Sequence, residues 1–342
     1  MSQIDQSALL IPSAVTERSP LESVPVEEAE AIAVTRRNIE RQVRADAATD
    51  GLARRDEHPK SHGCVEGTFE VLADLPPEFA VGLFAAPRTY PAWLRFSNAS
   101  TKPKDDKAGD GRGVGVKLMG VEGSRSGTQD LVLMNGPRFF LRDAAQALAF
   151  NQAGANALKF FAPSLNPFRW RVHELMAAMA ITGSKMSSPL GARYWSVTPY
   201  LFGEGAFKYS LIPAGEPSAH QDRTGPNFLH DNMAKSLAEA DARFDFAIQL
   251  RTPGMSVEDP TIEWRESDSP FVRVARLTIP KQGFDDPERL SFGENLSFTP
   301  WHGLDAHRPL GGINRVRRSV YEAISTLRHD LNAAPRQEPV RA

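Results

Sequence analysis

The stretch RRSVYEAISTLR, residues 317–328, has the most informative spacing in this chain. At about 100° per residue of an α-helix, Arg317, Tyr321 and Arg328 fall on one face. This face suits a tyrosinate that binds a metal ion, because a metal and a neighbouring guanidinium both stabilise the ionised phenol. Of the five tyrosines, only Tyr321 has an arginine four residues earlier. The alternative is an ordinary amphipathic helix, and this spacing alone does not choose between the two.

The residues before this helix predict a sheet with added helices. Short runs rich in β-branched or aromatic residues predict strands at 64–71, 93–97, 113–118, 130–134, 207–212, 244–250 and 271–279. Helical periodicity predicts helices at 26–50, 143–154, 169–183, 229–240 and 313–332. Residues 280–312 show no period and are expected to be irregular. Strands separated by turns indicate the α+β class, with an antiparallel, closed β-barrel and added helices.

The composition limits the class of protein. The chain has 342 residues and a formal net charge of −2, so it has no general excess of positive charge for binding nucleic acid. Its single cysteine, Cys64, excludes an intramolecular disulfide and fits a reducing compartment. No apolar run approaches the roughly 18 residues of a membrane span. We therefore expect a cytoplasmic protein with a flexible N-terminal arm at 1–24 and a single domain at 25–335.

Four further motifs precede the tyrosine helix in a fixed order. A histidine, His62, is followed by Gly-x-Phe at 67–69 within HPKSHGCVEGTFEV. The others are RFS at 95–97, DGRGVGVK at 110–117 and NGPRFF at 135–140. None of these is specific by itself, but their order and internal spacing together are.

With Arg317-x-x-x-Tyr321, these motifs resemble the haem catalase superfamily, particularly its short, catalase-related (catalase-like peroxidase) branch. The match runs from about His62 to Arg328. The resemblance implies a catalase-like core without the C-terminal flavodoxin-like domain. It also implies a haem cofactor, expected to be haem b, and an oxidoreductase that reduces H2O2 or organic hydroperoxides through an oxoferryl intermediate. A small-molecule electron donor and a homodimer are further expectations from the family.

The resemblance implies roles for the haem-binding residues. Tyr321 would be the axial iron ligand, as in catalase, and Arg317 would donate to its oxygen. Arg95 and Arg328 would pair with haem propionates, and Ser97 belongs to the same segment as Arg95.

The remaining roles concern the peroxide side of the haem and its walls. His62 would accept the proton of the bound hydroperoxide and return it to the outer oxygen. Asn135 and Ser61 would lie beside it, while Phe139 and Phe140 would keep the pocket apolar.

Three departures from the larger catalases stand out. Ser61 occupies the position before the distal histidine, where those enzymes usually have Val. Aligning Pro137 places their distal Asn at Met134, so Asn135 would need a local bulge. A third propionate-binding Arg is expected three residues before the distal histidine, where this chain has Pro59. Arg54, Arg55 and Lys60 are the candidates to replace it.

Two other functions remain open at this stage. Ser61 resembles the Thr of catalase-like allene oxide synthases, which favours a hydroperoxide isomerase or dehydratase as one alternative. The other alternative is a haem-binding protein with little turnover.

Overall fold

The computed structural model describes residues 19–216 and 219–339. The helices are α1 (Glu28–Asp50), α2 (Ala144–Ala153), α3 (Leu158–Phe161), α4 (Val172–Thr182), α5 (Phe228–Glu239), α6 (Pro287–Asn295) and α7 (Gly312–Leu331). The strands are β1 (Ser61–Val71), β2 (Thr89–Asn98), β3 (Arg112–Met119), β4 (Thr128–Met134), β5 (Tyr194–Trp195), β6 (Tyr200–Phe202), β7 (Gly205–Ala214), β8 (Ala242–Leu250) and β9 (Val272–Ile279).

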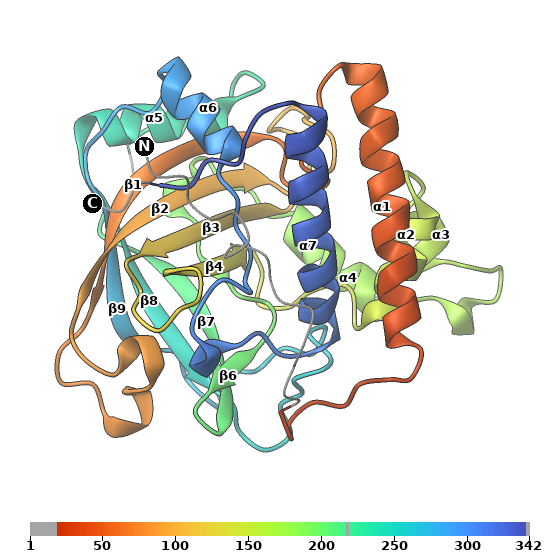
Figure 1. The fold of residues 1–342 in the computed structure, drawn as a ribbon, viewed down its shortest axis with the longest axis horizontal. Helices are drawn as coiled ribbons and strands as arrows, with labels where there is room; N and C mark the ends of the chain where they lie inside the picture. The colour runs from red at the N-terminus through yellow and green to blue at the C-terminus, as the bar shows by residue number, and fades with distance from the viewer. Residues whose placement is uncertain (1–18, 217–218, 340–342) are drawn as a thin grey trace.

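Eight of these strands close into an antiparallel barrel. The hydrogen-bonded order runs β4-β3-β2-β1-β9-β8-β7, and the short β5 pairs with both ends of this series. β6 forms a hairpin with β7 outside the ring. The closed antiparallel barrel with added helices that the sequence predicts is therefore confirmed (Figure 1).

Side-chain alternation along the strands separates a packed interior from an outer face. On β2, Leu94 and Phe96 are fully buried in the main core cluster. Their neighbours Arg95 and Ser97 must point the other way, because successive side chains in a strand alternate between faces. The outer face of β2 therefore carries polar groups that the barrel core does not use.

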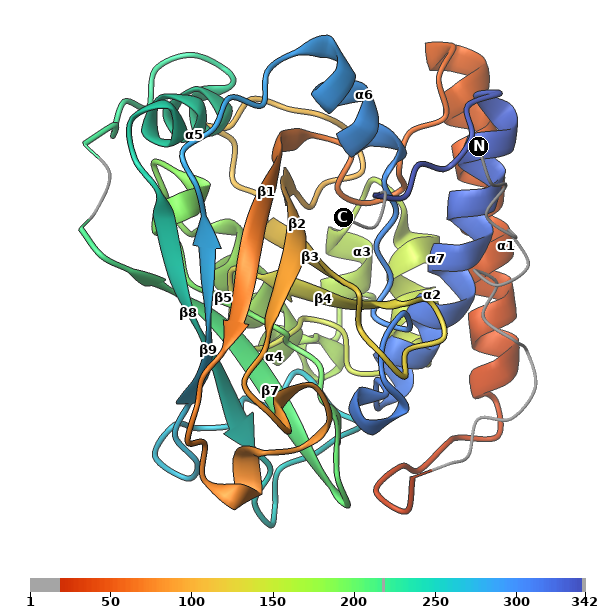
Figure 2. The same cartoon turned by 60° about the vertical axis from the view of Figure 1, so that its left-hand side comes forward.

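A second core joins α7 to α1 beside the barrel. Ile39 and Val43 of α1 belong to one buried cluster with Val316 and Val320 of α7. Their spacing of four residues places each pair on one helical stripe. Figures 1 and 2 show α7 standing between α1 and the barrel. One face of α7 therefore packs against α1, and the adjacent face is available to pack against the barrel.

The region 280–312 is the main error in the predicted elements. It contains α6, which begins with Pro287 after the N-cap Asp286, whose carboxylate accepts the amide of Arg289 at 2.8 Å. An Asp-Pro pair is a recognisable helix start. The region was expected to be irregular because α6 is short and only one of its residues, Gly293, is buried.

The segment before α1 is tied to the start of α7. Residues 1–18 of the predicted arm lie outside the described residues. In the described remainder, Glu22 accepts the amide of Gly311 at 3.0 Å and pairs with Arg315 at 2.7 Å. Arg315 also pairs with Glu28 and Glu258. The boundaries of the arm and of the single domain stay predictions.

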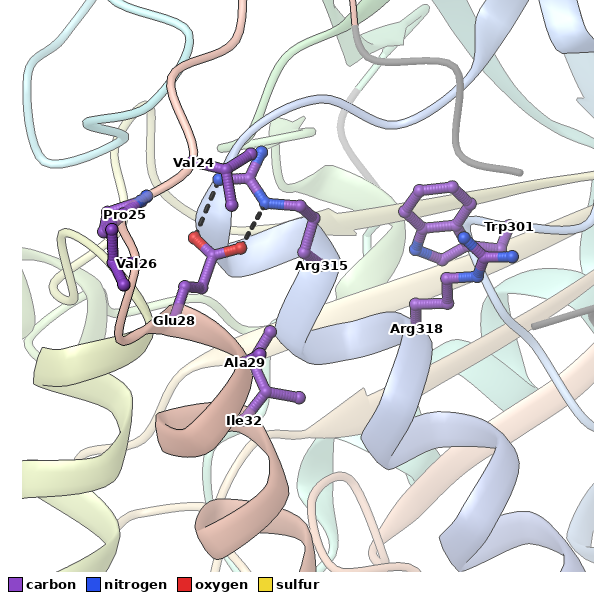
Figure 3. Close-up of a pocket in the computed structure, with 9 residues that line it drawn as sticks. All are labelled: Val24, Pro25, Val26, Glu28, Ala29, Ile32, Trp301, Arg315 and Arg318. Carbon is purple, nitrogen blue, oxygen red and sulfur yellow. Dashed lines mark hydrogen bonds and ion pairs between the residues drawn. The ribbon is translucent and has the colours of Figure 1, made fainter. Parts of the chain in front are cut away.

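A surface pocket lies near the N-terminal end of α1, and Figure 3 shows its lining. Apolar side chains such as Val24 and Ile32 line it together with Arg318, which lies over the ring of Trp301 at 4.8 Å. None of the sequence-predicted site residues lines this pocket. This pocket is therefore separate from the residues that the sequence predicts for the site.

None of the helices in the described part of the chain is both long enough and apolar enough to span a bilayer.

Candidate active site

His58 packs against the outer face of β2, beside Ser97 and Arg95. Its Nδ1 lies 3.0 Å from Ser97 Oγ, and Arg95 Nη1 donates to its backbone carbonyl at 2.9 Å. His58 has φ 63°, a left-handed conformation that is costly for a non-glycine residue and occurs more often at functional sites. A Cβ at Gly113 on the adjacent strand β3 would lie 2.5 Å from the imidazole Cε1, so a larger residue would displace the ring.

His62, the sequence-predicted distal histidine, lies on the opposite face of β2. Its Nε2 is 2.6 Å from the side-chain oxygen of Asn98. Ser97 and Asn98 are consecutive residues of β2, so their side chains point to opposite faces of the strand. His58, which contacts Ser97, and His62, which contacts Asn98, therefore lie on opposite faces. Burial lowers the pKa of His62 to about 4. The structure therefore brings His58, and not His62, to Ser97 and Arg95.

The surroundings of His62 form a buried polar network. Asn98 also accepts a hydrogen bond from Arg112 Nη1 at 2.6 Å and donates to Asp106 at 3.2 Å. Asp106 in turn pairs with Lys60 at 2.7 Å. These bonds connect β1, β2 and β3 with the 105–112 loop, while the Nδ1 of His62 is buried without a hydrogen-bond partner among the described residues.

A register shift explains why the sequence alone favoured His62. β1 has an irregularity at this residue, because Ser61 pairs with Ser97 while Gly63 pairs with Phe96. A bulge changes the direction of a side chain, and spacing counted along the chain does not reveal it. One signal was available, since Arg55 lies three residues before His58, as the family pattern requires.

Tyr321 and Arg317 contribute the α7 side of the site. Arg317 Nη1 donates to Thr198 Oγ1 at 3.0 Å and to Asn314 Oδ1 at 3.2 Å, and its guanidinium lies 5.6 Å from the Phe139 ring centroid. Burial raises the pKa of Tyr321, and Arg317 offsets part of that rise. The phenol is therefore protonated at neutral pH in the ligand-free protein, and its oxygen has no hydrogen-bond partner among the described residues.

Charged groups on α7 and on the barrel side of the site shift one another's pKa values. Burial, followed by Arg95, Arg317 and Arg55, lowers the pKa of His58 to about 3, so its imidazole is neutral at pH 7. The Glu57 carboxylate raises the pKa of Tyr321. Glu57 is exposed and Tyr321 partly so, yet desolvation raises the pKa of both. Arg317 of α7 is among the causes of the pKa shift at His58, and Glu57 is among those of the pKa shift at Tyr321, so α7 lies close to the segment that precedes β1.

Two other sequence-predicted residues, Asn135 and Ser61, have their polar groups occupied. The side-chain oxygen of Asn135 accepts the Arg112 amide at 2.6 Å, and its amide nitrogen donates to the Ile181 carbonyl at 2.9 Å. Ser61 Oγ donates to the Phe96 carbonyl at 3.4 Å. Neither residue contacts His58 in these bonds, and the residue before His58 is Glu57.

The aromatic pair at 139–140 lies partly where it was expected. Phe139 is buried and lies beside Arg317. Phe140 contacts Phe139, with ring centroids 4.9 Å apart, but its other ring contact is Phe150 on α2, at 5.0 Å. Phe139 is therefore the one of the pair that has a direct contact with a site residue.

Three arginines gather at the C-terminal end of α6. Arg328 donates to the Glu294 carboxylate at 2.6 Å, and Arg55 donates to the Glu294 carbonyl at 2.7 Å. Arg95 is 3.8 Å from the same carboxylate, and its Nε and Nη2 have no hydrogen-bond partner among the described residues. Burial and the nearby Arg55 lower the pKa of Arg95 to about 9 and that of Arg328 to about 10.

Comparisons with known proteins agree with this architecture. The family model described as Catalase matches residues 39–189. The catalase-related peroxidase of Mycolicibacterium paratuberculosis is 29% identical over 306 residues, covering 80% of this chain and 89% of that protein.

The chain is thus similar to the catalase superfamily, through the family model over residues 39–189 and through this relative over 306 residues.

Solved catalases share its fold at low sequence identity. A fungal catalase has 18% identity and a TM-score of 0.65, with 83% of this chain and 61% of that chain covered. Catalase A from Saccharomyces cerevisiae has 16% identity and a TM-score of 0.65, with 96% and 72% covered. The chain thus spans about three fifths of the fungal enzyme's chain.

The catalase superfamily is haem-dependent in general, and the residues present fit a haem. Arg95 and Arg328 lie within 3.8 Å of the Glu294 carboxylate, and Arg55 donates to the Glu294 backbone carbonyl. Glu294 is the one carboxylate that pairs with any of these three guanidinium groups among the described residues, which leaves a surplus of two positive charges. Two donor atoms of Arg95 are buried without a hydrogen-bond partner among the described residues. Two propionates would supply the missing charge and acceptors, while the unpartnered phenol of Tyr321 is a suitable iron ligand.

Proposed function

We propose that this chain is a haem-dependent peroxidase or catalase-like enzyme that acts on H2O2 or organic hydroperoxides. The main observation behind this proposal is the arrangement of two opposed surfaces. His58, Ser97 and Arg95 occupy the outer face of the barrel, and Arg317 on α7 is close enough to lower the pKa of His58. The similarity to a catalase-related peroxidase supports the same function.

The cofactor in this proposal is haem b, held within a single domain at 25–335. Tyr321 would bind the iron, while Arg55, Arg95 and Arg328 would bind the propionates. Arg317 would stabilise the charge on the phenolate, because it already lowers the pKa of that phenol. The sequence has one cysteine and therefore lacks the Cys-x-x-Cys-His motif of covalently attached c-type haem.

The proton chemistry is assigned to His58. A bound haem iron would supply a Lewis-acidic and redox-active centre for the peroxide. When His58 Nδ1 donates to Ser97 Oγ, Nε2 keeps its lone pair and accepts the proton of the hydroperoxide. The resulting imidazolium then returns that proton to the departing oxygen. Burial and the nearby arginines lower the pKa of His58, so its imidazole is neutral before the reaction and can accept that proton.

The structure offers less support for the isomerase alternative. That alternative rested on Ser61, whose hydroxyl bonds to a barrel carbonyl. The residue next to His58 is the acidic Glu57, which differs from both the Val of large catalases and the Thr of allene oxide synthases. Peroxide reduction with a small-molecule donor is therefore the function we favour.

A steady-state assay tests this function. We expect hemin-loaded protein to oxidise a dye with H2O2 or cumene hydroperoxide, or to release oxygen from H2O2, faster per haem than the same amount of free hemin. Dye oxidation and oxygen release that both stay at the free-hemin level despite full occupancy would reject the enzyme and favour a haem-binding protein.

Esterified haem tests the arginine cluster. Hemin dimethyl ester should bind about 10- to 100-fold more weakly than hemin, because each charge-assisted bond contributes roughly 1.5–3 kcal/mol. In Arg95→Gln this preference for hemin should shrink, whereas the surface control Arg88→Gln should keep it. Equal affinity of the wild-type chain for the two pigments, measured by absorption titration, would contradict the propionate assignment.

A further inference from the structure

The region from α3 to α4 exposes an unusual amount of apolar surface. We define its apolar face as Leu158, Leu165, Phe168, Val172, Met176 and Met179, all of which are exposed. Leu165 is 100% exposed and Phe168 is 97% exposed, both in the loop between α3 and α4. Figure 1 shows this yellow-green loop projecting from the right-hand side of the molecule. Large contiguous apolar patches are uncommon on soluble proteins and mark interaction sites.

The loop is held in shape by its own hydrogen bonds. Trp170 Nε1 donates to the Ser164 carbonyl at 2.8 Å, and the Asn166 side chain accepts the amide of Phe168 at 3.1 Å. The backbone amide of Arg171 donates to the Phe161 carbonyl at 2.8 Å, which closes the base of the loop. Leu165 and Phe168 are therefore presented outward by an ordered turn, and inserting them elsewhere would require little reorganisation.

The helix α4 continues the apolar face. Val172, Met176 and Met179 follow a spacing of four and three residues, which places them on one stripe of the helix. Ala177 and Ile181 on the other side are buried against the protein. α4 thus has apolar residues on both sides, although only one side packs within this chain.

The charges within the segment that carries the apolar face are mainly positive. Residues 158–185 contain four cations, Lys159, Arg169, Arg171 and Lys185, and one carboxylate, Glu174, for a formal charge of +3. The whole chain has a net charge of −2, so this segment differs in sign from the rest. Apolar and aromatic side chains among Lys and Arg are the pattern of surfaces that bind anionic lipid. A symmetric contact between two copies would instead bring two cationic segments together.

We propose that the apolar face and its surrounding cations form a docking site for an anionic lipid surface, with Leu165 and Phe168 entering the interface. The exposed cations Lys159, Arg169 and Lys185 would approach the lipid headgroups. This proposal goes beyond peroxide chemistry and does not depend on haem, because none of the site residues lies in the segment.

Vesicle co-sedimentation tests the proposal with the full-length protein. The wild-type chain should bind vesicles of phosphatidylcholine containing phosphatidylglycerol and should bind pure phosphatidylcholine much less. We expect L165S/F168S and R169E each to weaken binding about tenfold or more, since they remove buried apolar area or a cation near the headgroups. The matched control is L290S on α6, where Leu290 is 49% exposed, and it should bind as wild type does.

Two further measurements make the outcome unambiguous. Circular dichroism and H2O2 turnover of L165S/F168S should match those of the wild type, because these side chains have no partner in the described structure to lose. Absence of wild-type binding to the anionic vesicles at low salt, or undiminished binding by L165S/F168S, would overturn the proposal. A concentration-dependent wild-type dimer that L165S/F168S dissociates, without any vesicle binding, would also overturn it and assign the apolar face to self-association.

Discussion

Replacing His58 with Ala should lower peroxide turnover per bound haem by about 10²–10⁴-fold, the usual contribution of a positioned general acid–base group. His58 is neutral at pH 7, and Ser97 fixes one of its ring nitrogens at 3.0 Å. Its other nitrogen is then the available base on the outer face of β2. Stopped-flow measurement of the reaction with H2O2, normalised to haem content, gives the rate that this variant should lose.

His62→Gln is the matched control for this experiment. Gln can still donate to the Asn98 oxygen that His62 contacts at 2.6 Å. The variant should lose some stability, because a buried network is disturbed, yet keep turnover per haem within a few-fold of wild type. A large loss in His62→Gln together with an active His58→Ala would return the catalytic role to His62.

Tyr321→Phe should have the second large effect, on haem binding itself. The substitution removes the only atom of Tyr321 that can coordinate iron, so the pigment should dissociate or show a different absorption spectrum. Burial of the phenol raises its pKa, which means that iron binding must displace a proton from it. Haem affinity of the wild type should therefore fall as the pH is lowered. The Tyr321→Phe variant should lack the part of this pH dependence that comes from the Tyr321 phenol.

Tyr200→Phe separates ligation from packing. Tyr200 is also buried and also raises the pKa of Arg317. Its loss should leave the haem spectrum as in wild type. If both variants gave the wild-type spectrum, Tyr321 would no longer be the ligand.

The fold and the α7 side of the candidate site could be predicted from the sequence, because both depend on local patterns of residues. The helix carrying Arg317 and Tyr321 was predicted at 313–332 and observed at 312–331, since its apolar residues repeat at helical spacing. The central strands followed from β-branched runs, although β5 and β6 were missed because they contain only two and three residues.

The barrel side of the site could not be predicted in the same way. Choosing between His58 and His62 requires the strand register, and one irregularity at Ser61–Gly63 changes which side chain reaches Ser97. Asn135 was predicted to lie beside the peroxide, but its amide is bound by the Arg112 and Ile181 backbone groups, which are 23 and 46 residues away in sequence. Such contacts depend on the tertiary structure and leave no short-range signal.

An absorption titration of the purified wild-type chain with hemin tests the central claim most directly. The claim is that Tyr321 on α7 and the arginines facing the barrel hold one haem between them. We predict saturation at one hemin per chain, with a spectrum distinct from that of free hemin. A spectrum that remains that of free hemin at every ratio would contradict the claim.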